Sequence, residues 1–497
     1  MFPIQAIGIL MKNDVISNYL AQIFNVLIRF YLIPVYLSKL GTSAFGIISF
    51  YFSLESIMVL LDFGLGVASS KVLAERNDQT NKSVSHIIRF AESLYLALSI
   101  LIGVIIYCSS SFISSEWLRI DDKSINGIEV LSWMALLLTV SWPKSLYENF
   151  LIGQKKIVTK NIINVSINLI KVLLMIYFLS LENNKILAYL WVMIGCNLLE
   201  NIFLRYFSTK DVYVDFNYAT KRNDLKYFFK YATGVGFFSI LSLFIFQADK
   251  LFISKNMTTA ELGNYNLACV IPMAQFMLIY PITSAIFPQL VNYKKNSSNS
   301  FNNTYTDWSY LLSIICVSSF TFLTLNFPLI FEFWLGKAYR NDHINLIANE
   351  IMIGVLFHAL SSINISLFLA NEKSRTVIKI YVYSVVIYII SLFVFSSYSI
   401  LGVAFSWILC NFSIFIFSFI SLRNFDSLLF KKYLILLKQI SIFFLIILVG
   451  YFLNEKVFQL QNIYNLIFVC CIIIFSIYIV FYKILKQIIS TIFLTSN

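Results

Sequence analysis

Polar side chains recur at helical spacing inside long apolar runs of this 497-residue chain. The run at 15–38 carries four of them, spaced four, three and four residues apart: Asn18, Gln22, Asn25 and Arg29. The run at 161–181 carries a second set: Asn161, Asn164, Asn168 and Lys171. Residues three or four apart share one face of an α-helix. Each set could therefore bind a hydroxyl-rich or anionic ligand, or hydrogen-bond one helix to another.

Charged residues also lie within neighbouring apolar runs. Lys144 and Glu148 lie one turn apart, Glu55 and Asp62 lie seven residues apart and hence on one side of a helix, and Asp249 is followed by Lys250. The run at 185–208 adds a polar set: Asn197, Glu200, Asn201 and Arg205. A charge at the centre of a bilayer costs about 2.5–3.5 kcal/mol, so these side chains should face each other or water. Lys144 and Glu148 can neutralise each other one turn apart. Arg29 and Lys171 have no acidic residue one turn away on the same run.

The elements that carry these residues follow from composition. Hydrophobic residues make up 59% of the chain and charged residues only 12%, against about 25% charged in soluble domains. About 20 apolar residues cross a bilayer as a helix. We therefore expect an all-α integral membrane protein with 14 transmembrane helices, at about 15–38, 45–68, 84–108, 128–150, 161–181, 185–208, 228–254, 264–290, 308–331, 350–371, 376–397, 400–422, 434–453 and 463–485.

The net charge of +12 has a topological explanation. One set of alternate connections holds 25 of the 37 Lys and Arg residues, and the other set holds nine. Short cytoplasmic loops are enriched in Lys and Arg, so both termini are expected to be cytoplasmic and the protein to be multi-pass. The charge therefore predicts no nucleic-acid partner.

A short internal echo divides the chain into two halves. Residues 37–50 read LSKLGTSAFGIISF and residues 253–267 read ISKNMTTAELGNYNL, each joining the first two spans of a six-span set. Duplicated bundles are a transporter architecture. We expect an N-terminal six-helix bundle at 11–208, a cytoplasmic amphipathic linker at 209–230, a C-terminal six-helix bundle at 231–422 and two additional peripheral helices at 434–485.

One stretch of the chain resembles a known family. The matching features are Ile33-Pro34, Leu40-Gly41, Phe45-Gly46 and Leu61-Asp62-Phe63-Gly64, echoed by Asp249-Lys250-Leu251 and Leu262-Gly263. They resemble the start of bacterial polysaccharide flippases of the O-antigen (Wzx) type, which belong to the multidrug/oligosaccharidyl-lipid/polysaccharide (MOP) exporter superfamily. The resemblance implies two bundles in a pseudo-symmetric MATE-like arrangement that open alternately to the two sides of the bacterial inner (plasma) membrane.

The resemblance also implies a substrate, an undecaprenyl-diphosphate-linked oligosaccharide repeat unit of O-antigen or capsule type. Arg29, Lys171 and Lys144 would hold its diphosphate, and Asn25, Gln22 and Asn168 would hydrogen-bond its sugars. Membrane lipids and other polysaccharide-assembly membrane proteins are the other candidate partners. No cofactor is expected, but a proton or sodium gradient could drive transport through Asp62, Glu55 or Asp249. Asp62 could equally end a helix, and Asp249 could pair with Lys250.

Two other functions compete with the flippase interpretation. A MATE-like cation or drug exporter would favour carboxylates over cations at its centre. A membrane-embedded polysaccharide polymerase would need a large outer loop, whereas the longest outer connections here have fewer than about twenty residues. The sequence offers no catalytic constellation and no Cys/His metal cluster, and the seven cysteines lie in or beside apolar runs.

Overall fold

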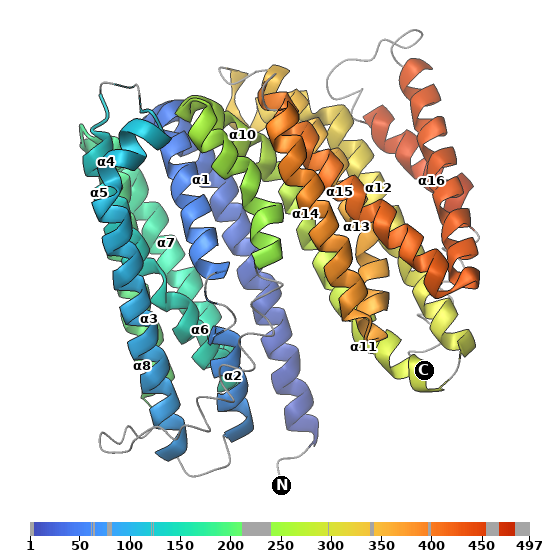
Figure 1. Cartoon of the computed structure of the whole chain (residues 1–497), viewed down its shortest axis with the longest axis horizontal. Coiled ribbons are helices and arrows are strands. Elements are labelled where there is room, and N and C mark those ends of the chain that lie inside the picture. Colours follow the sequence, from blue (N-terminus) through green and yellow to red (C-terminus); the bar gives the residue numbers. More distant parts are fainter. Residues whose placement is uncertain are drawn as a thin grey trace. The chain divides into compact units, whose positions relative to one another are not determined.

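The computed structural model describes residues 4–60, 62, 65–76, 82–120, 122, 124–210, 240–296, 298–337, 342–395, 399–453 and 467–482. Within these ranges all regular structure is helical (Figure 1). Backbone groups in lipid have no water to bond to, so apolar runs of this length fold as helices. The expected linker at 209–230 lies almost entirely outside the described residues.

The chain divides into two compact units, Met1–Asn264 and Tyr265–Asn497. The first unit contains α1 (Ile4–Leu60), α2 (Leu65–Arg76), α3 (Lys82–Cys108), α4 (Ser110–Phe112), the π-helical turn η1 (Ile113–Trp117), α5 (Gly127–Ser141), α6 (Pro143–Gly153), α7 (Ile157–Leu181), α8 (Lys185–Thr209), a helix whose described part begins at 240, and the start of α10 (Thr259–Ala274). The second unit contains the rest of α10, α11 (Phe276–Asn296), α12 (Ser298–Leu335), α13 (Asp342–Ala370), α14 (Ser374–Phe395), α15 (Ile400–Phe425), α16 (Ser427–Leu453) and the helix Ile467–Tyr482.

Each of the fourteen expected spans overlaps a described helix. α1 covers the first expected span and residues 45–60 of the second, with Gly41 (φ 80°) between them, and α2 begins at Leu65 within the second span. The fourth span is divided between α5 and α6. Among the residues that the structure describes, ten helices are long and apolar enough to cross a membrane by length and composition. The protein is therefore a multi-pass helical membrane protein, and the count of fourteen stays a prediction.

The boundary between the compact units falls inside α10, later than the expected linker. Residues 240–264, which open the second half of the sequence repeat, cluster with the first unit. The two copies of the repeat meet there at glycines. A Cβ on Gly46 would lie 1.7 Å from the carbonyl oxygen of Thr259, and one on Gly263 would lie 2.6 Å from that of Thr42. Gly46 faces Thr259, which lies four residues before Gly263, and Gly263 faces Thr42, which lies four residues before Gly46. The contact is therefore reciprocal.

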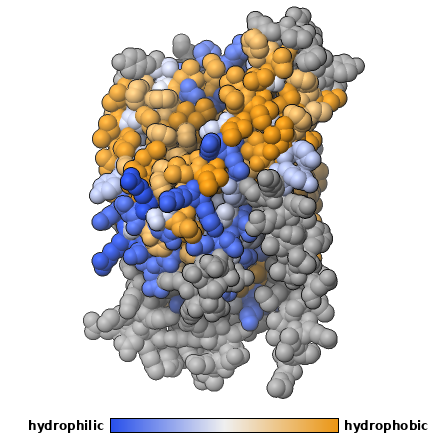
Figure 2. Space-filling model, turned by 90° about the vertical axis from the view of Figure 1, so that its right-hand side faces the viewer, coloured by the Kyte–Doolittle hydropathy of each residue, from blue (hydrophilic) through white to orange (hydrophobic). Residues whose placement is uncertain are grey.

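The outward faces of the helices are apolar. On α16 the exposed side chains include Leu445, Leu448 and Phe452, each more than half exposed. Figure 2 views the side of the molecule that α16 occupies at the right of Figure 1, and hydrophobic residues gather above hydrophilic ones there. Lys431 and Lys438 are exposed in the first half of α16. An exposed apolar face this long suits contact with lipid.

Candidate functional site in the first unit

Paired amides join α1 to α7. The side-chain amide of Asn161 donates to Asn18 Oδ1 at 2.9 Å and to Ser17 Oγ at 3.0 Å, and Asn168 donates to Asn25 Oδ1 at 2.8 Å. Both Asn pairs have the same sequence separation, 143 residues. The two helices are therefore parallel in register, and the two predicted polar faces lie against each other.

Arg29 and Lys171 lie one turn beyond the Asn25–Asn168 pair, at the same level of the two helices. Arg29 and Gln22 are exposed and Lys171 is half-buried. Among the residues that the structure describes, neither cation has a carboxylate within 4 Å or a side-chain hydrogen bond. Lys171 is within electrostatic range of Glu200 and Glu55. Two cations near one level without a close acid form a place where an anion would be stabilised.

Lys144 differs from those two cations because it is already paired. Its ammonium lies 2.7 Å from Glu200 Oε1 and 3.8 Å from Glu148 Oε1. Glu148 Oε1 instead accepts a hydrogen bond from the Asn164 amide at 2.9 Å. The Glu200 side chain is fully buried, whereas those of Lys144 and Glu148 are 30% and 25% exposed. The nearest acid to Lys144 is thus on another helix.

The interruption between α5 and α6 places these groups. Pro143 begins α6 and has no N–H to continue α5. The Asn201 amide donates to the carbonyl oxygen of Val140 at 2.7 Å, just before the interruption. Ser141 Oγ accepts from the Asn197 amide at 2.7 Å. Two α8 amides therefore hold the end of α5, and Lys144, the second residue of α6, lies beside Glu200.

The three acids expected to couple an ion lie in different surroundings. Glu55 Oε1 accepts a hydrogen bond from the Tyr51 hydroxyl at 3.1 Å, and Glu55 is within electrostatic range of Lys171. Asp62 accepts from the Tyr95 hydroxyl and from the Gly66 amide at 3.2–3.3 Å, the geometry of a residue that caps α2.

Asp249 lies on the helix whose described part begins at 240. It is buried, and its Oδ1 accepts from the Lys250 backbone amide at 2.8 Å. The Lys250 ammonium donates to the Phe246 carbonyl oxygen at 3.1 Å. Of the three acids, Glu55 is therefore the one that the described contacts bring to the cations.

Two contributors had no role assigned from the sequence. Glu200 was visible as part of a polar set in 185–208, but its partner lies 56 residues earlier, on another helix. Tyr51 gave no signal, because a tyrosine in an apolar run resembles any other core aromatic. Among the described residues no group of three or more His, Cys, Asp or Glu side chains could hold a metal ion.

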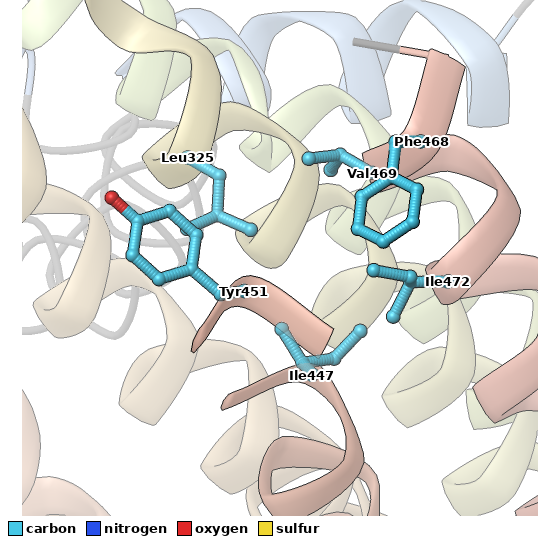
Figure 3. Close-up of a pocket in the computed structure, with 6 residues that line it drawn as sticks. All are labelled: Leu325, Ile447, Tyr451, Phe468, Val469 and Ile472. Atoms are coloured by element: carbon cyan, nitrogen blue, oxygen red, sulfur yellow. The ribbon is translucent and has the colours of Figure 1, made fainter. Parts of the chain in front are cut away.

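The second unit carries polar contacts of a different kind. Its buried hydrogen bonds between helices use neutral groups, such as Tyr305 with Asn364 and His358 with Asn411 at 3.0 Å. A small apolar crevice lies between α12, α16 and the helix Ile467–Tyr482 (Figure 3). Its lining residues are Leu325, Ile447, Tyr451, Phe468, Val469 and Ile472. These lining residues offer no charged group to a ligand.

Comparison with known families decides the assignment. A family model described as polysaccharide biosynthesis protein matches residues 11–294, more than half of the chain. The chain belongs to the polysaccharide biosynthesis protein family. The matched region includes the polar contacts among α1, α6, α7 and α8. It also includes the contact in which Gly46 and Gly263 take part. No curated protein sequence matches the chain at a significant level.

Solved structures of MOP superfamily transporters share the fold of this family member. An inward-facing multidrug resistance MATE transporter is similar with a TM-score of 0.70 and 14% identity, over 83% of this chain and 96% of that one. The lipid II flippase MurJ, in an inward closed conformation, is similar with a TM-score of 0.68 and 16% identity, over 95% of this chain and 98% of that one. A MOP transporter from Pyrococcus furiosus, described by the reverse polarity of its binding pocket, has a TM-score of 0.56 and 14% identity, over 86% and 96% of the two chains.

Proposed function

We propose that this protein is a flippase that carries undecaprenyl-diphosphate-linked oligosaccharide repeat units, of O-antigen or capsule type, across the bacterial inner membrane by alternating access. The observation that carries the proposal is a pair of cations, Arg29 and Lys171, that lie next to the amide ladder of α1 and α7 and have no close acid among the described residues. Membership of a polysaccharide biosynthesis family and the fold shared with a lipid II flippase support it.

The chemistry of such a substrate matches the residue types. A diphosphate is anionic, so Arg29 would bind it through a planar fork and Lys171 as a point charge. The sugars carry hydroxyl groups, which amides such as Asn25, Asn168 and Gln22 can hydrogen-bond. The hydrocarbon tail can remain in lipid during transfer. Both termini are proposed to face the cytoplasm, in accordance with the distribution of Lys and Arg.

A cation or drug exporter is the second candidate, because three carboxylates lie in the same region and MATE transporters share the fold. However, the carboxylates of this region have partners: Glu200 pairs with Lys144, Glu148 accepts from Asn164, and Glu55 accepts from Tyr51. In the described part of the cluster, the charged groups without close partners are cations. The cluster therefore favours an anionic substrate over a cationic one.

The test is to neutralise both cations in the cell. In spheroplasts that assemble the lipid-linked oligosaccharide, the double variant R29Q/K171Q should lower the fraction accessible to an added, impermeant lectin by about tenfold or more, because each charge-assisted hydrogen bond contributes about 1.5–3 kcal/mol. Lys379→Gln, an exposed lysine of α14, is the matched control and should leave that fraction unchanged. Full lectin access in the double variant, or loss of organic-cation efflux alone, would contradict the proposal.

A further inference from the structure

The Lys144–Glu200 pair joins an accessible cation to an inaccessible anion. The ammonium is 2.7 Å from Oε1 of a carboxylate whose side chain has no exposed surface, while Lys144 itself is 30% exposed. The second oxygen, Oε2, accepts no hydrogen bond from any residue that the structure describes. Among the described residues, the Lys144 ammonium is therefore the one cation at ion-pair distance from Glu200, and the Lys144 side chain is partly exposed.

Few other charges surround Glu200 in the described part of the chain. Lys171 on α7 is within electrostatic range of both Glu200 and Glu55, the latter on α1. Glu148 on α6 lies 3.8 Å from the Lys144 ammonium that Glu200 also contacts. Cys196 lies one turn earlier on α8 itself. α5 faces this region with neutral groups, the Val140 carbonyl and Ser141, since its ionisable residue, Glu129, lies at the opposite end of the helix beside Asn126. Lys144 is the close partner in this set.

We propose that Glu200 is an internal counterion that an anionic substrate group displaces from Lys144, and that the displacement is accompanied by uptake of one proton on Glu200. The inference rests on the proposed function, because it assigns Lys144 to the same diphosphate that Arg29 and Lys171 would bind. An ionised Glu200 left without Lys144 would be an uncompensated buried charge, which proteins avoid by protonating the group. A neutral carboxyl at that position releases Lys144 to the anion.

The coupling has a definite sign. The complex holds one proton more than the free protein, so proton and anion bind cooperatively. Affinity for the anion should fall as the pH rises wherever Glu200 is ionised in the free protein and protonated in the complex. The limiting change is a tenfold loss of affinity for each pH unit, because one proton is taken up.

The experiment titrates the purified full-length protein with farnesyl diphosphate between pH 6 and pH 8, with farnesol as the uncharged control. The wild type should lose affinity with rising pH more steeply than Glu200→Gln, by up to tenfold per pH unit, since ionisation of the probe affects both proteins equally. Glu200→Gln should bind at least as tightly as the wild type at pH 8. Adding Lys144→Gln to Glu200→Gln should weaken binding about tenfold or more. Glu148→Gln, whose carboxylate is 3.8 Å from the same ammonium, should keep the wild-type slope.

A measurement on the wild type alone guards against a variant that fails to fold. Calorimetry at pH 8 in two buffers with different ionisation enthalpies counts protons, and a diphosphate has already lost its last proton there. Net uptake, up to one proton per diphosphate, supports the proposal, whereas zero uptake or release overturns it. Equal pH slopes for the wild type and Glu200→Gln also overturn it and leave the flippase proposal intact. Farnesyl diphosphate that binds no better than farnesol overturns both.

Discussion

Local contacts divide the three candidate substrate-binding cations, Arg29, Lys144 and Lys171, into two kinds. Lys144 is held by a buried acid, whereas Arg29 and Lys171 have no close acid among the described residues. The i,i+4 spacing favours Glu148 as the partner of Lys144, but Asn164 hydrogen-bonds the Glu148 oxygen that faces it. Spacing along one helix could not reveal this, because the competing groups come from α7 and α8.

Spacing along the chain also fails for Asp62, which was expected to lie on the same side of one helix as Glu55. A separation of seven residues places Glu55 and Asp62 on one side of a continuous helix. α1 ends at Leu60 and α2 begins at Leu65, so the helical period does not extend to Asp62. In contrast, the spacing of the amides in α1 and α7 predicted their shared faces, since both helices are regular throughout those residues.

The amide ladder leads to a prediction about stability rather than transport. Asn161→Leu removes two hydrogen bonds at a position that is only 5% exposed. Interhelical hydrogen bonds in membranes contribute about 0.6 kcal/mol on average. We expect a lower melting temperature in detergent with most transport retained, because the change lies more than two turns from Lys171. Ser166→Leu, exposed on the same helix, should melt like the wild type; equal melting of both variants would contradict a structural role for Asn161.

Among the helices, the reciprocal glycine contact brings α1 and α10 close together at the sequence repeat. An alanine at position 46 would put its Cβ 1.7 Å from the Thr259 carbonyl oxygen, which is part of the backbone and cannot rotate away. The sequence echo predicted that these segments are equivalent. The sequence echo could not predict that the two segments touch, because the contact depends on Gly46 and Gly263 lying opposite each other, and both lack a side chain.

Gly46→Ala and Gly263→Ala should therefore destabilise the protein. Overpacking of this kind typically costs about 1–3 kcal/mol, even though alanine is favoured over glycine in a helix by about 1 kcal/mol. Gly195→Ala on α8 is the matched control, since a Cβ added to Gly195 would have no neighbouring atom within 4 Å among the described residues. Thermal unfolding in detergent should give a lower midpoint for the first two variants and an unchanged or higher midpoint for the third.

For the whole molecule, the sequence indicated the helical class and the repeat better than it indicated the boundary between compact units. Apolar runs determine where helices form, and those runs were visible. The boundary inside α10 depends instead on which helices pack together, and residues 240–264 pack with the first unit although their sequence opens the second repeat.

Orientation in the membrane is the prediction that belongs to this scale. The distribution of Lys and Arg places the connection between η1 and α5 outside and the turn between α13 and α14 inside. In a variant without native cysteines, an impermeant maleimide added to spheroplasts should label Ser124→Cys, which is exposed in the first connection. It should label Lys373→Cys, exposed in the second, only after the membrane is permeabilised. The reverse pattern would invert the topology.

The glycine contact also has a consequence for biosynthesis. Gly46 and Gly263 are 217 residues apart in the chain, and a ribosome adds about 5–20 residues each second. The Gly46 face of α1 must therefore wait about 10–40 s in the membrane before its partner has been made. During that interval the contact that Gly46 makes with α10 is missing. The first unit can complete its packing once residues 240–264 have been made, when most of the second unit is still to be translated.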